Sequence, residues 1–333
     1  MDTKPLLSSI ESELQKQISR FHTPRTKPFH EMLTYHMGWT GEGAGPEATG
    51  KRIRPLLVLL STSACGADWQ PALPAAAAVE LVHNFSLVHD DIQDNSDKRR
   101  GRPTTWVKWG MPMAINVGDA LFVMSNQAII DLKGDYPAEV VVKAAEILHN
   151  TCLELTRGQF LDMSYEERKD LSVEDYWPMI AGKTAALLSA CCHIGALLGG
   201  GDEARQDAYR AFGHYLGLAF QVQDDILGIW GDEVLTGKSA ASDLIEGKNS
   251  LPVLAGLGSN GQFAERWKRG PIRADEVQQL ARVLASEGGY ETATEAARQM
   301  TDLALMSLRE ADPQGEAGDA LFELADKLLK RNQ

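Results

Sequence analysis

Apolar residues recur along most of the chain with the spacing of amphipathic helices. Leu6, Ile10, Leu14 and Ile18 lie four residues apart and form one apolar stripe in a helix predicted at residues 5–20. Similar patterns predict further helices at about residues 50–65, 73–94, 113–132, 137–165, 173–199, 203–230, 239–257, 274–287, 290–311 and 316–331. No alternation of apolar and polar residues is long enough to indicate a β-sheet. The pattern therefore predicts an all-α fold.

Two stretches interrupt the helical pattern. Residues 22–50 are rich in Gly, Pro and Thr, and they predict a loop around at most a short helix. Residues 257–273 are expected to form an exposed loop. Neither stretch changes the composition enough to mark a domain boundary. We therefore expect a single domain, residues 1–333, with about ten or more helices and a C-terminal helical part at 274–331.

The charge balance narrows the possible functions. Apolar residues make up 44% of the 333 residues, which is enough for a large buried core. There are 33 basic and 46 acidic side chains, and the resulting net charge of −13 argues against a nucleic-acid-binding protein. An anionic substrate fits such a chain only where metal ions or a local basic cluster reverse the sign of the charge.

The cysteines and the N-terminus indicate the compartment. The four cysteines form no CxxC pair, so we expect reduced thiols rather than a zinc site or a disulfide scaffold. The N-terminal residues do not resemble a signal peptide. We find no apolar run of the roughly 18 residues that a membrane-spanning helix needs. These features predict a cytoplasmic protein without a transmembrane segment.

A first acidic cluster lies at residues 89–97, at the end of a predicted helix. Asp90 and Asp94 are four apart and share a helix face, while Asp91 lies about 100° away around the helix. Asp90 and Asp94 repel each other, and the helix dipole disfavours a carboxylate at this end. A hard cation such as Mg²⁺ relieves this repulsion and prefers carboxylate and phosphate oxygens. For this motif alone, a solvated acidic helix end remains the alternative.

A second acidic pair favours the metal hypothesis. Asp224 and Asp225 stand inside an apolar segment, where charged side chains are unfavourable unless something compensates them. Two such pairs in one helical protein indicate metal sites that face each other across a bundle.

Basic residues accompany both acidic pairs. They are Lys51 and Arg54, then Arg99 and Arg100, Lys183 inside an apolar helix, and Lys238 and Lys248 on either side of Asp243. Arginine offers phosphate a two-pronged fork and lysine a compact charge. Residues 45–51 also fit the start of a P-loop, but Arg52 replaces the required Ser or Thr and no strand precedes it. We therefore exclude a P-loop nucleotide-binding site.

Six segments together resemble the trans-isoprenyl diphosphate synthases, the family of farnesyl and geranylgeranyl diphosphate synthases. They read GKRIRP, LVHDDIQDNSDKRRGRPT, GQFLDM, GKTAALL, FQVQDDILGIWGD and GKSAASDLIEGKNSLPV, and they lie in the family's order between about residues 45 and 255. The resemblance implies an all-α bundle around a deep central cavity, in a homodimer. It also implies an enzyme, a trans-polyprenyl diphosphate synthase, most like the geranylgeranyl diphosphate synthases.

The resemblance further implies roles for individual residues. Three Mg²⁺ ions would be held with the allylic diphosphate, two of them by Asp90 and Asp94 and the third by Asp224, with Asp91 and Asp225 supporting these ligands. The allylic diphosphate would be gripped by Arg99, Lys183 and Lys238. Isopentenyl diphosphate would be held by Lys51, Arg54, His83 and Arg100. Further site residues would be Thr184, Gln221, Asp243 and Lys248.

One position departs from the family pattern. The second acidic motif often carries a third aspartate, and Gly228 stands there instead. The first two aspartates remain, so activity is still expected. We expect Asp232 or Asp243 to supply additional negative charge nearby.

The implied reaction is head-to-tail condensation. Mg²⁺ and basic side chains neutralise the allylic diphosphate, so that it leaves with the electrons of its C1–O bond. The double bond of isopentenyl diphosphate then attacks C1, and a proton leaves to the released diphosphate. No protein base is required, and the protein's contribution is positioning, charge stabilisation and exclusion of water.

Helix geometry bears on the product length. Phe85 and Ser86 precede Asp90 by five and four residues, on the path expected for the growing tail. One aromatic ring beside a small serine resembles the geranylgeranyl synthases and predicts a C20 product. The alternative for Phe85 is ordinary core packing.

Other functions remain to be weighed. A C15 or C25 product would need only a different stop for the tail. A class I terpene cyclase normally carries an Asn/Ser/Glu metal motif on its second helix and no isopentenyl site. A non-catalytic partner subunit should have lost site residues, whereas only Gly228 departs from the pattern here.

Overall fold

The structure is a computed structural model that describes residues 1–166, 168–231 and 241–329. Apart from one two-residue ladder, the regular structure in these residues is helical, which confirms the predicted all-α fold. The chain divides into two compact units, which we describe one at a time. The first comprises Met1–Asn150, Cys191–Gln206 and Pro313–Ala320, and the second comprises Thr151–Ala190, Asp207–Asp312 and Leu321–Gln333. The single domain expected from the sequence stays a prediction.

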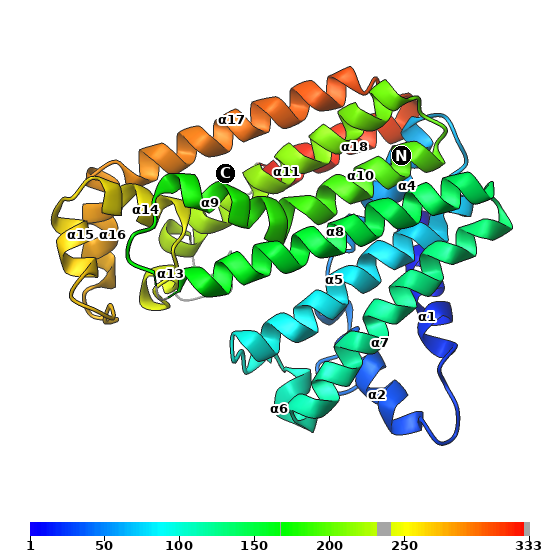
Figure 1. The fold of residues 1–333 in the computed structure, drawn as a ribbon, viewed down its shortest axis with the longest axis horizontal. Coiled ribbons are helices and arrows are strands. Elements are labelled where there is room, and N and C mark those ends of the chain that lie inside the picture. Colours follow the sequence, from blue (N-terminus) through cyan, green and yellow to red (C-terminus); the bar gives the residue numbers. More distant parts are fainter. Residues whose placement is uncertain (167, 232–240, 330–333) are drawn as a thin grey trace. The chain divides into compact units, whose positions relative to one another are not determined.

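The first unit is built around two long helices that lie side by side, α5 and α7 (Figure 1). Its elements are α1 (Lys4–Ser19), α2 (Lys27–His36), α3 (Pro46–Thr49), α4 (Ile53–Ala64), the 3₁₀ helix η1 (Gln70–Ala72), α5 (Leu73–Gln93), β1 (Lys98–Arg99), β2 (Arg102–Pro103), α6 (Thr105–Trp109), α7 (Met111–Ile130) and the 3₁₀ helix η2 (Asp131–Gly134). Helix α8 (Ala138–Tyr165) begins in this unit.

The apolar faces of α1 and α5 form the core of this unit. The stripe predicted for residues 5–20 is confirmed, because all four of its members on α1 are at most 1% exposed. On α5, Ala75–Ala78 and the following Val79, Leu81 and Val82 are fully buried. Alanine is the best helix former, and its small side chain lets neighbouring helices approach closely. Glu80 is 3% exposed within this apolar run, so it needs a partner of opposite charge.

A short antiparallel ladder follows α5. Lys98 pairs with Pro103 and Arg99 with Arg102. The turn between the two strands has positive φ angles at Arg100 (51°) and Gly101 (73°), as in the turns that connect tight hairpins. Two residues per strand are too few to produce a detectable alternation, which is why the sequence pattern did not indicate this ladder.

The second unit contains the second acidic motif on the long helix α11. Its elements are the later part of α8, α9 (Val173–Ile180), the π-helix η3 (Ala181–Ala185), the start of α10 (Ala186–Leu198), most of α11 (Glu203–Trp230), α13 (Ser242–Ile245), α14 (Leu251–Gly258), α15 (Gln262–Trp267), α16 (Val277–Ser286), α17 (Gly289–Glu310) and the later part of α18 (Gly315–Leu329). The rest of α10, from Cys191, and the first turns of α11 and α18 belong to the first unit. Helix α14 packs against α9 and α17, so the chain after the acidic motif returns to the helices beside it.

Three predicted boundaries were wrong. Residues 22–50 contain the ten-residue helix α2 as well as α3, and residues 257–273 contain α15. Phe263 on α15 is fully buried against the apolar side chains of α16, so this stretch is anchored rather than an exposed loop. In the predicted helix 239–257, residues 246–250 separate α13 from α14. Pro252 fits this second start, because proline is tolerated in the first turn of a helix.

Three helical stretches in the described residues are long and apolar enough to cross a membrane, judged by length and composition alone. They are Gln70–Gln93, Met111–Gly134 and Val173–Leu198. The expectation that no segment would reach this threshold was therefore wrong. Between 44% and 67% of the most apolar window of each stretch is buried inside the protein.

Candidate active site

The first aspartate motif ends helix α5. Asp90 and Asp91 lie in its last turn, and Asp94 is the residue that caps it. The chain leaves the helix at Asn95, whose φ angle of 51° is one that asparagine tolerates better than most residues. Three carboxylates thus meet the negative end of the helix dipole, an arrangement that requires nearby positive charge.

Arg99 supplies part of that charge. The turn between α5 and β1 brings its guanidinium back over the helix end, where Nε donates to Asp91 Oδ1 at 2.8 Å. Its Nη2 lies 3.5 Å from Asp90 Oδ2. Asp91 is 2% exposed, and burial raises its pKa to about 6 although Arg99 acts in the opposite direction. Asp91 is therefore an ion-paired, buried carboxylate, whereas Asp90 is partly exposed and Asp94 is exposed.

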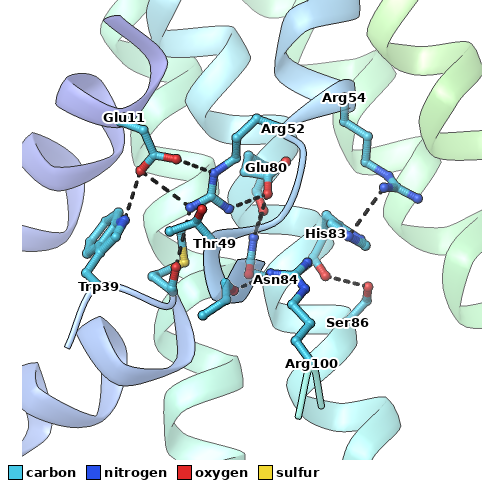
Figure 2. A network of polar contacts seen from close by, with 12 residues as sticks. Glu11, Trp39, Thr49, Arg52, Arg54, Glu80, His83, Asn84, Ser86 and Arg100 are labelled. Atoms are coloured by element: carbon cyan, nitrogen blue, oxygen red, sulfur yellow. Dashed lines mark hydrogen bonds and ion pairs between the residues drawn. The ribbon is translucent and has the colours of Figure 1, made fainter. Parts of the chain in front are cut away.

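Two further basic residues of the predicted site, Arg54 and Arg100, lie near His83 on α5. Arg54 Nη1 lies 3.3 Å from His83 Nε2, and Arg100 Nη1 donates to the Ala48 carbonyl at 2.7 Å (Figure 2). Burial and the charges of the neighbouring arginines hold the pKa of His83 well below its usual value. His83 is therefore neutral at physiological pH and accepts a hydrogen bond from Arg54. Lys51 is exposed nearby in the chain, before α4.

A small cavity of about 30 Å³ lies beside these arginines. Its lining includes His36, Asn84, Asp91, Arg99 and Arg100. It has room for about one water molecule, so it is not by itself a substrate pocket. His36 Nε2 and Asn84 Oδ1 are buried without a hydrogen-bond partner, which marks this region as polar and incompletely satisfied.

Arg52 is a charged residue that the sequence reasoning passed over in favour of its neighbours. Its side chain is 3% exposed and is enclosed by two carboxylates. Nε donates to Glu11 Oε1 at 2.6 Å, and Nη1 donates to Glu80 Oε1 at 2.7 Å (Figure 2). Glu80 was the feature of the sequence that could have indicated this pair. It lies inside the apolar run of α5, and a buried acidic side chain needs a partner of opposite charge.

The proposed chain-length residues lie one helix turn and more before Asp90. The ring of Phe85 packs against Phe122 of α7, with 5.0 Å between the ring centroids. The Ser86 hydroxyl donates to the His83 carbonyl of its own helix at 2.8 Å. Phe122 was not singled out from the sequence, because its contact with Phe85 depends on how α5 and α7 pack.

In the second unit, Asp225 is fully enclosed by hydrogen-bond donors. Its carboxylate accepts bonds from Tyr176 Oη at 2.7 Å, Gln221 Nε2 at 3.0 Å and the Leu251 backbone N at 3.1 Å. Burial raises the pKa of Asp225 to about 6, against the lowering effect of these bonds. Asp225 thereby joins α9, α11 and the first turn of α14. Asp224 beside it is only partly buried.

Two further predicted residues connect to this network. The Thr184 hydroxyl donates to Gln221 Oε1 at 2.8 Å, so Thr184, Gln221 and Asp225 form one chain of hydrogen bonds. Lys183 Nζ lies 2.5 Å from Asp162 Oδ2. Asp162 belongs to the GQFLDM segment, and the sequence analysis gave it no role. The π-helix η3 carries Lys183 and Thr184, and such single turns are frequent at functional sites.

Two glycines let the helices that carry this pair approach each other. A Cβ atom added to Gly158 of α8 would lie 2.1 Å from the backbone N of Lys183. One added to Gly182 would lie 2.7 Å from the carbonyl oxygen of Glu154. Neither position has space for a side chain, so both glycines are needed for the distance between Asp162 and Lys183.

Gly228 faces the carboxylate of Asp243. A Cβ atom at position 228 would lie 2.0 Å from Asp243 Oδ2, so a third aspartate there would require the Asp243 side chain to move. Asp243 is 5% exposed and pairs with Lys248 Nζ at 3.3 Å. Burial lowers the pKa of Lys248, but the carboxylates of Asp243 and Glu246 raise it overall. Lys238 and Asp232 lie outside the described residues.

The donor set suits a hard cation that also binds a substrate. Among the residues that the structure describes, no three His, Cys, Asp or Glu side chains form a metal-binding group. Mg²⁺ does not require such a cage, because it commonly binds one or two carboxylates together with waters and phosphate oxygens. The carboxylates of Asp90 and Asp224, which are partly exposed, and of Asp94, which is exposed, fit that mode, whereas Asp91 and Asp225 are buried.

Comparisons with known proteins agree with this chemistry. A sequence model described as polyprenyl synthetase matches residues 45–284. A geranylgeranyl diphosphate synthase of Mycobacterium tuberculosis is 38% identical over 315 residues, which cover 92% of this chain and 89% of the relative. A (2E,6E)-farnesyl diphosphate synthase of the same organism is 39% identical over 319 residues, covering 92% and 87%.

A solved structure shares the fold. The geranylgeranyl pyrophosphate synthase of Corynebacterium glutamicum, complexed with isoprenyl diphosphate and magnesium, superposes with a TM-score of 0.86. It is 25% identical, and the match covers all of both chains. Together with the matched residues 45–284 and the curated relatives, this similarity shows that the chain belongs to the polyprenyl synthetase family.

Proposed function

We propose that the protein condenses isopentenyl diphosphate with allylic diphosphates head to tail and releases a C20 product, geranylgeranyl diphosphate. As a member of the polyprenyl synthetase family, the chain is a prenyltransferase of isoprenoid synthesis. The observation that carries the proposal lies within the first unit, where the aspartate motif at the end of α5 occurs together with a cluster of arginines around a neutral histidine. A diphosphate substrate requires such positive charge in a protein with a net charge of −13.

Magnesium bound by Asp90, Asp94 and Asp224, as about three ions with the allylic diphosphate, would lower the charge on the leaving group. Arg99, Lys183 and Lys238 would add positive charge to the same group. Arg99 and Lys183 are paired with carboxylates, and they would exchange these partners for diphosphate oxygens. The C1–O bond then breaks with its electron pair on the diphosphate.

The isopentenyl diphosphate would lie at Lys51, Arg54, His83 and Arg100, of which His83 stands two helix turns before Asp90 on α5. A neutral imidazole that accepts a bond from Arg54 orients this guanidinium without competing for the anion. The new carbon–carbon bond forms between the substrate double bond and C1, and the proton leaves to the released diphosphate. The role of these side chains is to bind and orient, since no protein base is required.

Product length would be set by the aromatic pair of Phe85 and Phe122. Their rings contact each other one helix turn and more before Asp90, on the path where a growing tail would extend. The relatives include both farnesyl and geranylgeranyl synthases at similar identity, so identity alone does not decide the length. We expect Phe85→Ala to shift products beyond C20 and Phe122→Ala to shift them less, as sized by chromatography. Unchanged products in both variants would remove this pair from the stop.

We also propose that the protein is a cytoplasmic homodimer. Helix α7 exposes several large apolar side chains, each 42–50% exposed, at Met111, Met113, Ile115, Val123 and Ile130. Several exposed apolar side chains of this size on one helix often mark an interface between subunits. The apolar helices 70–93, 111–134 and 173–198 would then serve core and interface rather than span a membrane. Val123→Lys should shift the mass in light scattering towards the monomer.

The decisive experiment combines the purified protein with Mg²⁺, isopentenyl diphosphate and, in turn, dimethylallyl, geranyl or farnesyl diphosphate. Formation of C20 diphosphate supports the proposal, and a C15 or C25 diphosphate corrects only the length. A hydrocarbon released without consumption of isopentenyl diphosphate would indicate a terpene cyclase. No product with any primer would indicate a non-catalytic partner subunit.

A further inference from the structure

We propose that Arg52 is a positioning residue for the isopentenyl diphosphate site and that Glu11 of α1 acts on that site through it. The inference rests on the proposed function, in which Lys51 and Arg54 bind this substrate. Arg52 lies between Lys51 and Arg54 in the sequence, but its side chain contacts different groups.

The contacts of Arg52 exclude it from binding the substrate directly. Its guanidinium lies 2.6 Å from Glu11 and 2.7 Å from Glu80, and Nη2 reaches the Met37 carbonyl at 3.5 Å. The side chains of Arg52 and Glu80 are only 3% and 4% exposed. A buried charge pair of this kind is sensitive to the loss of either partner, because the remaining charge cannot be solvated.

The backbone around Lys51 has a conformation that needs such support. Gly50 and Arg52 have positive φ angles of 79° and 48°, and a non-glycine residue in this region is strained unless its surroundings hold it there. The guanidinium of Arg100 packs against Gly50, where an added Cβ would lie 2.7 Å from Nη2. Lys51 thus lies between Gly50, against which Arg100 packs, and Arg52, which two carboxylates hold in place.

Figure 2 shows the consequence for side-chain direction. The Arg52 side chain turns towards Glu11 and Glu80, whereas Arg54 extends to His83 on the other side of the chain. Because α4 begins at Ile53, the conformation of Arg52 sets the direction of its first turn and so the direction of Arg54. Holding Arg52 therefore orients both proposed ligands of the substrate.

Glu11 connects this support to the N-terminal helix. Besides Arg52, its carboxylate accepts a hydrogen bond from Trp39 Nε1 at 2.8 Å. Glu11 is 29% exposed, so its substitution is tolerated more easily than that of the buried Glu80. The N-terminal helix, which carries none of the family motifs, thereby influences the affinity for one of the two substrates.

The test is Glu11→Gln, which keeps the shape of the side chain and removes its charge. We expect the dissociation constant and KM for isopentenyl diphosphate to rise roughly tenfold, as for other mutations that act through a connected network. The kcat and the KM for the allylic substrate should stay within about twofold, because the aspartate motif has separate partners. Trp39→Phe, which removes only the bond to Glu11, should have a smaller effect in the same direction.

Glu13→Gln is the matched control on the same helix. Glu13 bonds to Lys16 and Gln17 and takes no part in the Arg52 network, so its loss should leave both substrates unaffected. Isothermal calorimetry of isopentenyl diphosphate on each variant reports binding without turnover. Binding that weakens in Glu11→Gln while the wild type makes no product would reject the proposed function only. Unchanged binding in Glu11→Gln and Trp39→Phe, or a change that Glu13→Gln reproduces, overturns the inference.

Discussion

The two aspartate motifs bury their second aspartate by different means. At the end of α5, Asp91 is neutralised by the charge of Arg99, in a region where arginines also surround His36 and His83. Within α11, Asp225 is held by a tyrosine hydroxyl, an amide and a backbone N–H. Paired acidic motifs that look alike in sequence therefore have unlike surroundings. One depends on charge and the other on hydrogen-bond geometry.

The largest effect is expected at the first aspartate of each motif. Asp90→Ala and Asp224→Ala should each lower kcat by about 10²–10³-fold, or about 3–4 kcal/mol, the scale of a lost electrostatic contribution to the transition state. Steady-state kinetics with saturating Mg²⁺ measures the loss. The exposed Asp97 after α5 and Asp207 on α11 provide alanine controls that should retain activity. A fully active Asp90 or Asp224 variant would contradict the proposed metal ligands.

The second aspartates test the difference between the motifs directly. Asp91→Asn and Asp225→Asn should each lower the free energy of unfolding by about 1–3 kcal/mol, because each leaves a hydrogen-bond donor, Arg99 or one of the groups around Asp225, without its acceptor. The loss in Asp91→Asn should shrink in high salt, since Arg99 is 30% exposed and its ion pair is partly screened in the wild type. The loss of stability in Asp225→Asn should stay the same in high salt. Urea unfolding at low and high NaCl compares them, and equal salt dependence would remove the distinction.

A smaller effect is expected at Gly228, which is specific to the second motif. Gly228→Ala places a methyl group against the carboxylate of Asp243 and should cost about 1–3 kcal/mol of stability, as overpacking does. Gly258→Ala on α14 is the control, since nothing lies within 4 Å of an added Cβ there. Thermal unfolding measures both variants. If they behave alike, Asp243 does not occupy the space next to residue 228.

The smallest effect concerns the arginine-rich region of the first motif. Burial, together with Arg99 and Arg100, lowers the pKa of His36 to about 3. The unfolded chain then takes up a proton at His36 below about pH 6.5 and the folded protein does not, so stability falls as the pH drops from 6.5 towards 3. In His36→Gln the loss between pH 7.5 and 5 should be smaller by at most about 2 kcal/mol. The exposed His22 is the control, and an unchanged pH dependence in His36→Gln would contradict the assignment.

The helices could be predicted because their signal is local. The stripe on α1 repeats within four residues, and each member contributes to the same buried face. The boundary at residues 257–273 was wrong because Phe263 and its partners on α16 meet only in the folded chain. The composition of a segment does not show that one of its side chains is buried against another helix.

The site residues also fall into two groups. Those whose partners are near in the sequence were predicted, and those whose partners are distant were not. The aspartates and their flanking cations were found because motif and partner lie within a few residues, as Asp91 and Arg99 do. Arg52 was missed because its partners stand 41 and 28 residues away. Asp162 was missed for the same reason, since it lies 21 residues before Lys183. Long-range charge pairs leave no periodic trace in a single sequence.

The close approach of Gly158 and Gly182 has a consequence for engineering. Every substituent larger than hydrogen at either position moves α8 away from η3 and with it the pairing of Lys183. A mutant library that diversifies this enzyme should keep both codons invariant, although neither residue carries a functional group. Substitutions at these two positions are not tolerated because there is no space for a side chain. A screen limited to polar positions would overlook both glycines.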